Sequence, residues 1–316
     1  LEQQTWYQKY KDDPRVDKLQ ATSPAMNGRK IPLAVIRATD ENRPTIYLLN
    51  GAGGAEQDMD WLKLSDAVDF YHSKNVNVVI PQAGAFSYYT DWVSEPNSKY
   101  LKGPQKWETF LSKELPGAIE GHIKADNHRA IAGMSMSATS SLLLAEHHQG
   151  FYDAVGSLEM GEHVGRRNYP TYAEVLHRSV VPGGHVLVQQ MSRSGKHPGG
   201  GPFIESFIVP DMTMRPVGET VNYLQRAGLE VRDVQAMREH YVWTVDAWLE
   251  TFESRWDDVV AMVGEEMARV WRLYLVGGGL SFEQGRMGVD QILSVKPSSI
   301  GSASLRVSTV PTAAVR

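Results

Sequence analysis

The chain of 316 residues contains no cysteine, which excludes disulfide bonds, thiolate metal sites and a cysteine nucleophile. It has no run of lysine or arginine, and its formal net charge is -5. A nucleic-acid surface would need a basic patch, so small ligands or lipids are the expected partners. No apolar run reaches the roughly 18 residues that span a bilayer, so no transmembrane segment is expected. The 42% of hydrophobic residues still support a folded core.

Residues 130–138 have the layout of a nucleophile elbow, the strained turn that lifts a serine above a sheet. An apolar strand ends in Gly-Met-Ser-Met-Ser and runs into helix-forming residues. The serine of such a turn occupies sparsely allowed backbone space, so its neighbours two positions away must be small, as Gly133 and Ser137 are. We therefore predict that Ser135 is a nucleophile. The alternative is a serine that caps a buried helix.

Two backbone N–H groups are candidates for binding the oxyanion that forms when a serine attacks an ester. Helix onset after Ser135 leaves the N–H of Met136 free. A buried strand expected at 45–49 runs into the glycine-rich turn 50–54, where the N–H of Ala52 is the best placed second donor. The alternative for this turn is an ordinary flexible loop.

Strands alternate with helices along the first half of the chain. Strands are expected at 31–37, 45–49 and 75–81, and an amphipathic helix at 107–116. This alternation predicts an α/β fold with a mainly parallel sheet, helices on both faces and ligands at the carboxyl ends of the strands. Ser135 lies at such an end.

Five segments of the first 156 residues fall in the order of a known family: 47–51, 89–92, 106–111, 114–116 and 133–137. Together they resemble the trehalose mycolyltransferases of the antigen 85 type. The resemblance implies an α/β-hydrolase-fold acyltransferase of the cell envelope, which moves a mycolyl chain between trehalose lipids through an acyl-serine. It implies that Ser135 is the nucleophile and that the Ala52 and Met136 amides form the oxyanion hole. Asn50 and Trp92 would lie around the sugar and acyl site, although the family usually has an aspartate where Asn50 stands.

A different family is indicated from about residue 153 to residue 297. Residues 159–165, 168–172, 181–190 and 271–275 resemble the C-terminal half of a cyclopropane-fatty-acid synthase-like methyltransferase. Such enzymes attach a one-carbon unit from S-adenosylmethionine to the double bond of an unsaturated acyl chain. The resemblance implies that Glu162 and Tyr241 sit at the bicarbonate or general-base site. Gln189 stands where many members carry a histidine.

The two resemblances meet at residues 152–158, within a strand sequence that both families share, and they predict a chimera. Its expected parts are a hydrolase-like half at 1–156, a Rossmann-type methyltransferase-like half at 157–297 and a disordered serine-rich tail at 298–316. The N-terminal half implies a secreted or cell-envelope protein, and the C-terminal half a cytoplasmic one. The glycine-rich loop that holds adenosylmethionine in the second family belongs before Asp153, where mycolyltransferase-like sequence stands instead. No metal site is expected.

A serine hydrolase also needs a histidine base and an acid, which normally follow the serine in the order acid, histidine. The mycolyltransferase partners belong in the half that has been replaced. Residues 185–190 could serve as the next sheet strand and 229–234 as the one after it. On this threading the acid is Glu205 or Asp211 and the base is His240. The alternative is that His240 packs at a helix start.

Three functions follow from these observations. The leading hypothesis is serine acyl transfer or ester hydrolysis on lipid or acyl-sugar esters, without a cofactor. The second is a methyltransferase that uses S-adenosylmethionine on unsaturated fatty acyl chains. The third is a folded hybrid scaffold without catalytic activity.

Overall fold

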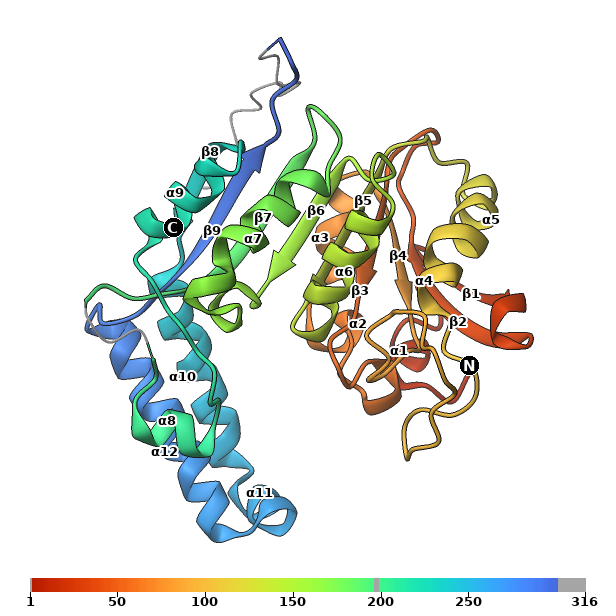
Figure 1. Ribbon diagram of the computed structural model, residues 1–316. Helices are drawn as coiled ribbons and strands as arrows, with labels where there is room; N and C mark the ends of the chain where they lie inside the picture. Colours follow the sequence, from red (N-terminus) through yellow and green to blue (C-terminus); the bar gives the residue numbers. More distant parts are fainter. Residues whose placement is uncertain (1, 196–198, 301–316) are drawn as a thin grey trace.

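A computed structural model describes residues 2–195 and 199–300, and the strands of this part form one sheet (Figure 1). The order across the nine-stranded sheet is β1-β2-β4-β3-β5-β6-β7-β9-β8. The strands are β1 (Val16–Ser23), β2 (Arg29–Ile36), β3 (Thr45–Leu49), β4 (Asn77–Pro81), β5 (Arg129–Met134), β6 (Ala154–Leu158), β7 (His185–Ser192), β8 (Glu230–Ala236) and β9 (Gly288–Val295).

The centre of the sheet is parallel and its two edges are antiparallel. Strands β4, β3, β5, β6 and β7 are parallel neighbours, whereas β1 and β2 at one edge and β9 and β8 at the other pair in antiparallel fashion. All five residues of β4 are buried, as expected for a parallel strand covered on both faces. The predicted α/β fold is therefore confirmed, with a mixed sheet whose core is parallel.

Helices cover both faces of this sheet (Figure 1). One face packs its apolar side chains, such as Tyr47 and Val188, against α4 to α7 and α9. The other face packs against α1 to α3 at one end and against α10 and α12 at the other. The helices are α1 (Thr5–Lys9), α2 (Trp61–Leu64), α3 (Ala67–Ser73), α4 (Trp107–Thr109), α5 (Leu115–His122), α6 (Met136–His147), α7 (Gly165–Arg178), α8 (Pro202–Phe207), α9 (Val217–Arg226), α10 (Arg238–Ser254), α11 (Trp256–Val263) and α12 (Glu265–Glu283).

The strand that the two resemblances share, β6, lies inside the sheet. Ala154 pairs with Ala130 of β5 on one side and with His185 of β7 on the other. One buried apolar cluster runs across this junction, from Leu33 of β2 to Ile292 of β9. The hydrolase-like and methyltransferase-like segments therefore build one sheet with a common core.

The place of residues 229–234 differs from the sequence threading. These residues contribute to β8 at the sheet edge, and β9 lies between β8 and β7, antiparallel to both. Charged side chains of β8, including Glu230, Arg232 and Asp233, are exposed, which suits an edge strand and not a central one. The threading missed β9 because a long helical segment separates it from β8. The expected tail at 298–316 lies, from residue 301 onward, outside the described residues.

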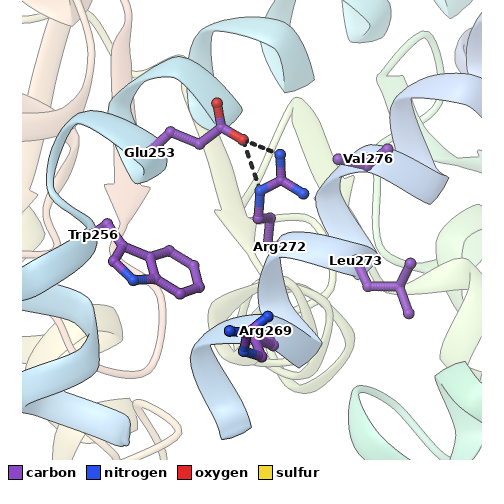
Figure 2. Close-up of a pocket in the computed structure, with 6 residues that line it drawn as sticks. All are labelled: Glu253, Trp256, Arg269, Arg272, Leu273 and Val276. Atoms are coloured by element: carbon purple, nitrogen blue, oxygen red, sulfur yellow. Dashed lines mark hydrogen bonds and ion pairs between the residues drawn. The ribbon is translucent and has the colours of Figure 1, made fainter. Parts of the chain in front are cut away.

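Helices α10 and α12 project from the sheet as a hairpin with α11 at its tip (Figure 1). A hollow of about 450 Å³ near the tip is lined by Glu253, Trp256, Arg269, Arg272, Leu273 and Val276 (Figure 2). Both arginines there are engaged by carboxylates, Arg272 by Glu253 and Arg269 by Glu265. No helix in the described part of the chain is long and apolar enough to cross a membrane.

Candidate active site

Ser135 lies in the turn between β5 and α6, where a nucleophile elbow places its serine. Its backbone has φ 54° and ψ -123°, a conformation that residues with a side chain rarely adopt. The residue is exposed, and its hydroxyl has no hydrogen-bond partner among the described residues. This combination of strain and exposure is the geometry of a serine presented above a sheet.

Gly133 and Ser137 make this tight turn possible. A Cβ atom on Gly133 would lie 2.2 Å from the carbonyl oxygen of Ser137, so only glycine fits. The buried Ser137 hydroxyl accepts the N–H of Met134 at 3.0 Å and lies 3.0 Å from the carbonyl oxygen of Leu49. Ser137 therefore fastens the elbow to the end of β3.

The N–H groups of Ala52 and Met136 are available at this edge of the sheet. Leu49 of β3 pairs with Gly133 of β5, so the turn after β3 and the elbow lie at the same end of two parallel strands. Within the described residues, neither N–H donates to a protein acceptor. Met136 also opens the 12-residue helix α6, whose N-terminal dipole favours negative charge. An oxyanion hole made by these two groups stays a prediction with which this placement is compatible.

A loop at residues 84–92 forms a wall beside the elbow. The N–H of Phe86 donates to the carbonyl oxygen of Ala52 at 2.8 Å, and Ser140 of α6 donates to that of Tyr88 at 2.5 Å. Phe86 and Tyr88 have φ values of 59° and 56°. Left-handed backbone at non-glycine residues often marks functional sites, and the sequence pattern did not predict it here.

The two residues expected around the sugar, Asn50 and Trp92, both make structural hydrogen bonds. Asn50 is 1% exposed, donates to the carbonyl oxygen of Pro81 at 3.1 Å and accepts the N–H of Trp61 at 3.2 Å. The carbonyl oxygen of Pro81 can only accept a hydrogen bond, and an ionised aspartate has no proton to donate. An aspartate could therefore not replace Asn50 in this bond. The indole of Trp92 donates to the carbonyl oxygen of Ser87 at 2.8 Å. Their contacts with substrate remain predictions.

The expected acid and base form no hydrogen bond with Ser135. His240 is exposed in the first turn of α10, where its ring packs against a neighbouring tryptophan. Asp211 pairs with His163 at 3.0 Å, and Glu205 is exposed on α8. Because β9 separates β8 from β7, the start of α10 is displaced from the place that the threading gave His240. The catalytic roles assigned to these residues remain untested predictions.

A second polar cluster lies at the carboxyl end of β6, beside the middle of β7. The Gln189 side chain donates to Glu159 Oε1 at 2.8 Å, and the Tyr241 hydroxyl donates to the same oxygen at 3.2 Å. Gln291 of β9 donates in turn to the side-chain oxygen of Gln189 at 2.6 Å. The structure thus brings together Gln189 and Tyr241, two residues that the sequence indicated. They surround the carboxylate of Glu159, which the sequence analysis did not single out.

Glu162 is buried beside this cluster, in the short turn after β6. Its Oε1 accepts the N–H of Met191 at 3.3 Å, and its Oε2 has no partner in the described part of the chain. Burial, and then the negative charge of Glu159, raises the pKa of Glu162 to about 8. At neutral pH most Glu162 side chains therefore carry a proton that can be donated to Glu159.

Sequence reasoning missed Glu159 and Gln291 as site residues. Glu159 stands two residues after Ser157 at the end of a predicted strand, and its φ of 55° shows that the chain turns sharply there. A polar residue just after the carboxyl end of a parallel strand indicates a candidate site residue, because ligands bind at these strand ends. Gln291 could not be found in this way because its strand was not predicted.

Comparison with known proteins gives two overlapping matches. The profile of the mycolic acid cyclopropane synthetase family matches residues 123–292, and that of the Esterase family matches residues 23–179. A protein named "Probable fatty acid methyltransferase" from Pseudomonas putida is 36% identical over 163 residues, which cover 49% of this chain and 41% of the relative. The diacylglycerol acyltransferase/mycolyltransferase Ag85A of Mycobacterium bovis is 34% identical over 145 residues, 45% of this chain and 42% of the relative.

Among solved structures, the cyclopropane synthase MmaA2 from Mycobacterium tuberculosis aligns with a TM-score of 0.49 and 14% identity, over 82% of this chain and 80% of that chain. The chain spans about two fifths of the length of the two curated relatives. The two matches confirm its chimeric character, and the longer one covers more than half of its residues. The chain belongs to the mycolic acid cyclopropane synthetase family through residues 123–292, and its residues 23–179, which include the turn at Ser135, are similar to the Esterase family.

Proposed function

We propose that the chain is a serine acyltransferase or esterase that acts on lipid esters through an acyl-serine. The observation that carries this proposal is the elbow, in which a strained and exposed Ser135 precedes α6. A serine that only capped the helix would accept an N–H of the first turn, and Ser135 forms no such bond. The strain at Ser135 is therefore better explained by presentation of a nucleophile.

The proposed reaction uses groups at one edge of the sheet. The Ser135 oxygen attacks the ester carbonyl carbon, and the carbonyl oxygen becomes an oxyanion that the N–H groups of Ala52 and Met136 stabilise. Collapse of this intermediate expels the alcohol and leaves an acyl-serine, which water or a second alcohol then cleaves. Because no histidine bonds Ser135 in the described residues, we expect turnover to be slow.

Apolar side chains near the elbow support a lipid ester as substrate. Met134, next to Ser135, is 36% exposed, and Tyr88, whose carbonyl oxygen is bonded by α6, is 51% exposed. An acyl chain could cover these surfaces, which gains roughly 25 cal/mol for each Å² removed from water. The name of the acyltransferase relative points to the same class of substrate.

Replacement of Ser135 by alanine should abolish ester hydrolysis, since the attacking oxygen is lost. We expect the rate with a p-nitrophenyl ester of a medium-chain fatty acid to fall at least about 100-fold, to the level of buffer. Ser73→Ala is the matched control, because Ser73 is exposed on α3 and bonds only the carbonyl oxygen of Phe70. Equal hydrolysis by the Ser135 and Ser73 variants would rule out the proposed nucleophile.

Methyl transfer to an unsaturated acyl chain is the second candidate, and the polar cluster at Glu159 is the observation that favours it. A carboxylate held by Gln189 and Tyr241 can accept a proton, which such a reaction requires when a substrate cation forms. The family match over residues 123–292 supports this candidate.

The residues at the strand ends do not fit the methyl donor of that candidate, S-adenosylmethionine. The turn after β5 is closed on itself, because the backbone of Ser137 fills the space beside Gly133. In the glycine-rich turn after β3, the side chain of Gln57 fills the space beside Gly53. The side chain of Glu56 fills the space beside Gly54. Gly53, Gly54 and Gly133 are therefore not free for close approach of a ligand, so we derive no step through this cofactor.

Calorimetry with S-adenosylmethionine is therefore expected to give no binding heat at concentrations up to about 1 mM. Absence of heat at this concentration means a dissociation constant of about 1 mM or weaker, which corresponds to a binding free energy no more favourable than about -4 kcal/mol. The chain alone is used, with the buffer injection as its reference. A saturable heat would restore methyl transfer as the leading function.

A further inference from the structure

We propose that Glu159 acts as the general base for Ser135 and receives the serine proton through one water molecule. This inference rests on the proposed acyl-serine function and names the group that activates the nucleophile. It assigns a base from the methyltransferase-like half of the chain to a serine from the hydrolase-like half.

Strand register places the two residues side by side. Met134 of β5 pairs with Leu158 of β6, and each of these residues ends its strand. The N–H of Ser135 donates to the carbonyl oxygen of Leu158 at 3.2 Å. Ser135 and Glu159 are thus the first residues beyond two adjacent parallel strands, whose neighbours lie roughly 4.8 Å apart. No other titratable side chain follows either strand so directly.

The carboxylate of Glu159 is held in place from the side opposite to β5. Gln189 of β7 and Tyr241 of α10 both donate to its Oε1, and they act as positioning residues. The backbone N–H of Glu159 also donates to the carbonyl oxygen of Gln189 at 2.9 Å. The left-handed conformation of Glu159, with φ 55°, turns the chain at this point. These constraints hold the carboxylate at a fixed place beyond the end of β6, the strand next to β5.

The charged and titratable groups around Glu159 come from three elements. Glu162 in the turn after β6 has its pKa raised to about 8, Tyr241 belongs to α10, and the pKa of Tyr274 in α12 is raised by burial and then by the charge of Glu159. No cation pairs with Glu159 in the described residues. When Glu162 loses its proton, a second negative charge stands beside Glu159 and favours transfer of the serine proton.

Direct contact is not made, because Ser135 Oγ has no hydrogen-bond partner in the described part of the chain. One water can span such a gap. As the bond from Oγ to the acyl carbon forms, the Ser135 proton passes to the water, and a proton of that water passes to the Glu159 carboxylate. The carbonyl π electrons move to the oxyanion. On collapse, the leaving alkoxide takes the proton back from Glu159 through the water.

The test measures the rate of acyl-serine formation in Glu159→Gln, which keeps the shape of the side chain but cannot accept the proton. We expect an acylation rate constant about 100-fold below that of the wild type. The wild-type rate should rise between pH 6 and 9 as the Glu162 proton leaves, and the variant should lose this rise. Glu159→Asp should recover part of the rate. Glu108→Gln is the matched control, because Glu108 pairs with His147 and His148 away from the strand ends.

Two outcomes separate this inference from the function on which it rests. If Glu159→Gln acylates at the wild-type rate with an unchanged pH profile while Ser135→Ala does not react, the base is another group and the acyl-serine function stands. If the wild-type serine itself forms no acyl-enzyme, both proposals fail. Far-ultraviolet circular dichroism and the urea midpoint establish that the compared variants are folded.

Discussion

Gly133→Ala is expected to lower the free energy of unfolding by about 3 kcal/mol and to remove the reactivity of Ser135. The added Cβ would lie 2.2 Å from the carbonyl oxygen and 2.4 Å from the carbonyl carbon of Ser137. Both neighbours are backbone atoms, so they cannot rotate away as a side chain would. Moving them displaces the start of α6 and breaks the contacts of Ser137 with Met134 and Leu49.

Urea unfolding at constant pH measures this change, and Gly117→Ala provides the control. Gly117 lies in α5, and a Cβ there would meet no atom within 4 Å. Alanine is favoured over glycine in a helix by up to about 1 kcal/mol, so the control should be as stable as the wild type or more stable. An equally stable and reactive Gly133→Ala protein would show that the turn is not the closed elbow described above.

Glu162→Gln is expected to abolish most of the fall in stability between pH 5 and pH 9. The pKa of Glu162 is raised from 4.5 to about 8, so the folded protein holds a proton that the unfolded chain has released. The stabilising effect is full below the ordinary pKa of a glutamate and is lost as the pH rises through about 8. The loss is on the order of 4 kcal/mol, because each tenfold difference in proton affinity between the folded and unfolded protein corresponds to about 1.4 kcal/mol.

The glutamine amide keeps an acceptor for the N–H of Met191 and can donate to Glu159 at every pH. We therefore expect the variant to exceed the wild type in stability at pH 9 and to resemble it at pH 5. The measurement is urea unfolding at both pH values, with Glu41→Gln as the control because Glu41 is exposed and pairs with Lys124. Parallel pH curves for wild type and Glu162→Gln would contradict the raised pKa.

The elbow could be predicted from sequence because its determinants are local. A strand, a glycine, a serine and a second small residue within five positions dictate the turn, and the structure places Ser135 at that turn with left-handed backbone. The parallel core was also predictable, since strands and helices alternate in the first half of the chain. Gln189 and Tyr241 were named from their resemblance to a family, and the structure brings them together.

Other parts depend on contacts between residues that are distant in sequence. The role of Glu159 follows from the register between β5, β6 and β7, which no local pattern encodes. Strand β9 begins with Gly288 and includes the polar residues Asp290 and Gln291, so its apolar pattern is weak. Its insertion between β7 and β8 decides where α10 starts, and therefore explains why His240 is not where the threading put it.

The central claim is that Ser135 is a working nucleophile, and the mass of the intact protein tests it most directly. After incubation with a fluorophosphonate, we predict one added phosphonyl group, located on the peptide that contains Ser135 and absent from Ser135→Ala. An unchanged mass at millimolar reagent would contradict this account. So would a phosphonyl group that remains in the Ser135→Ala protein.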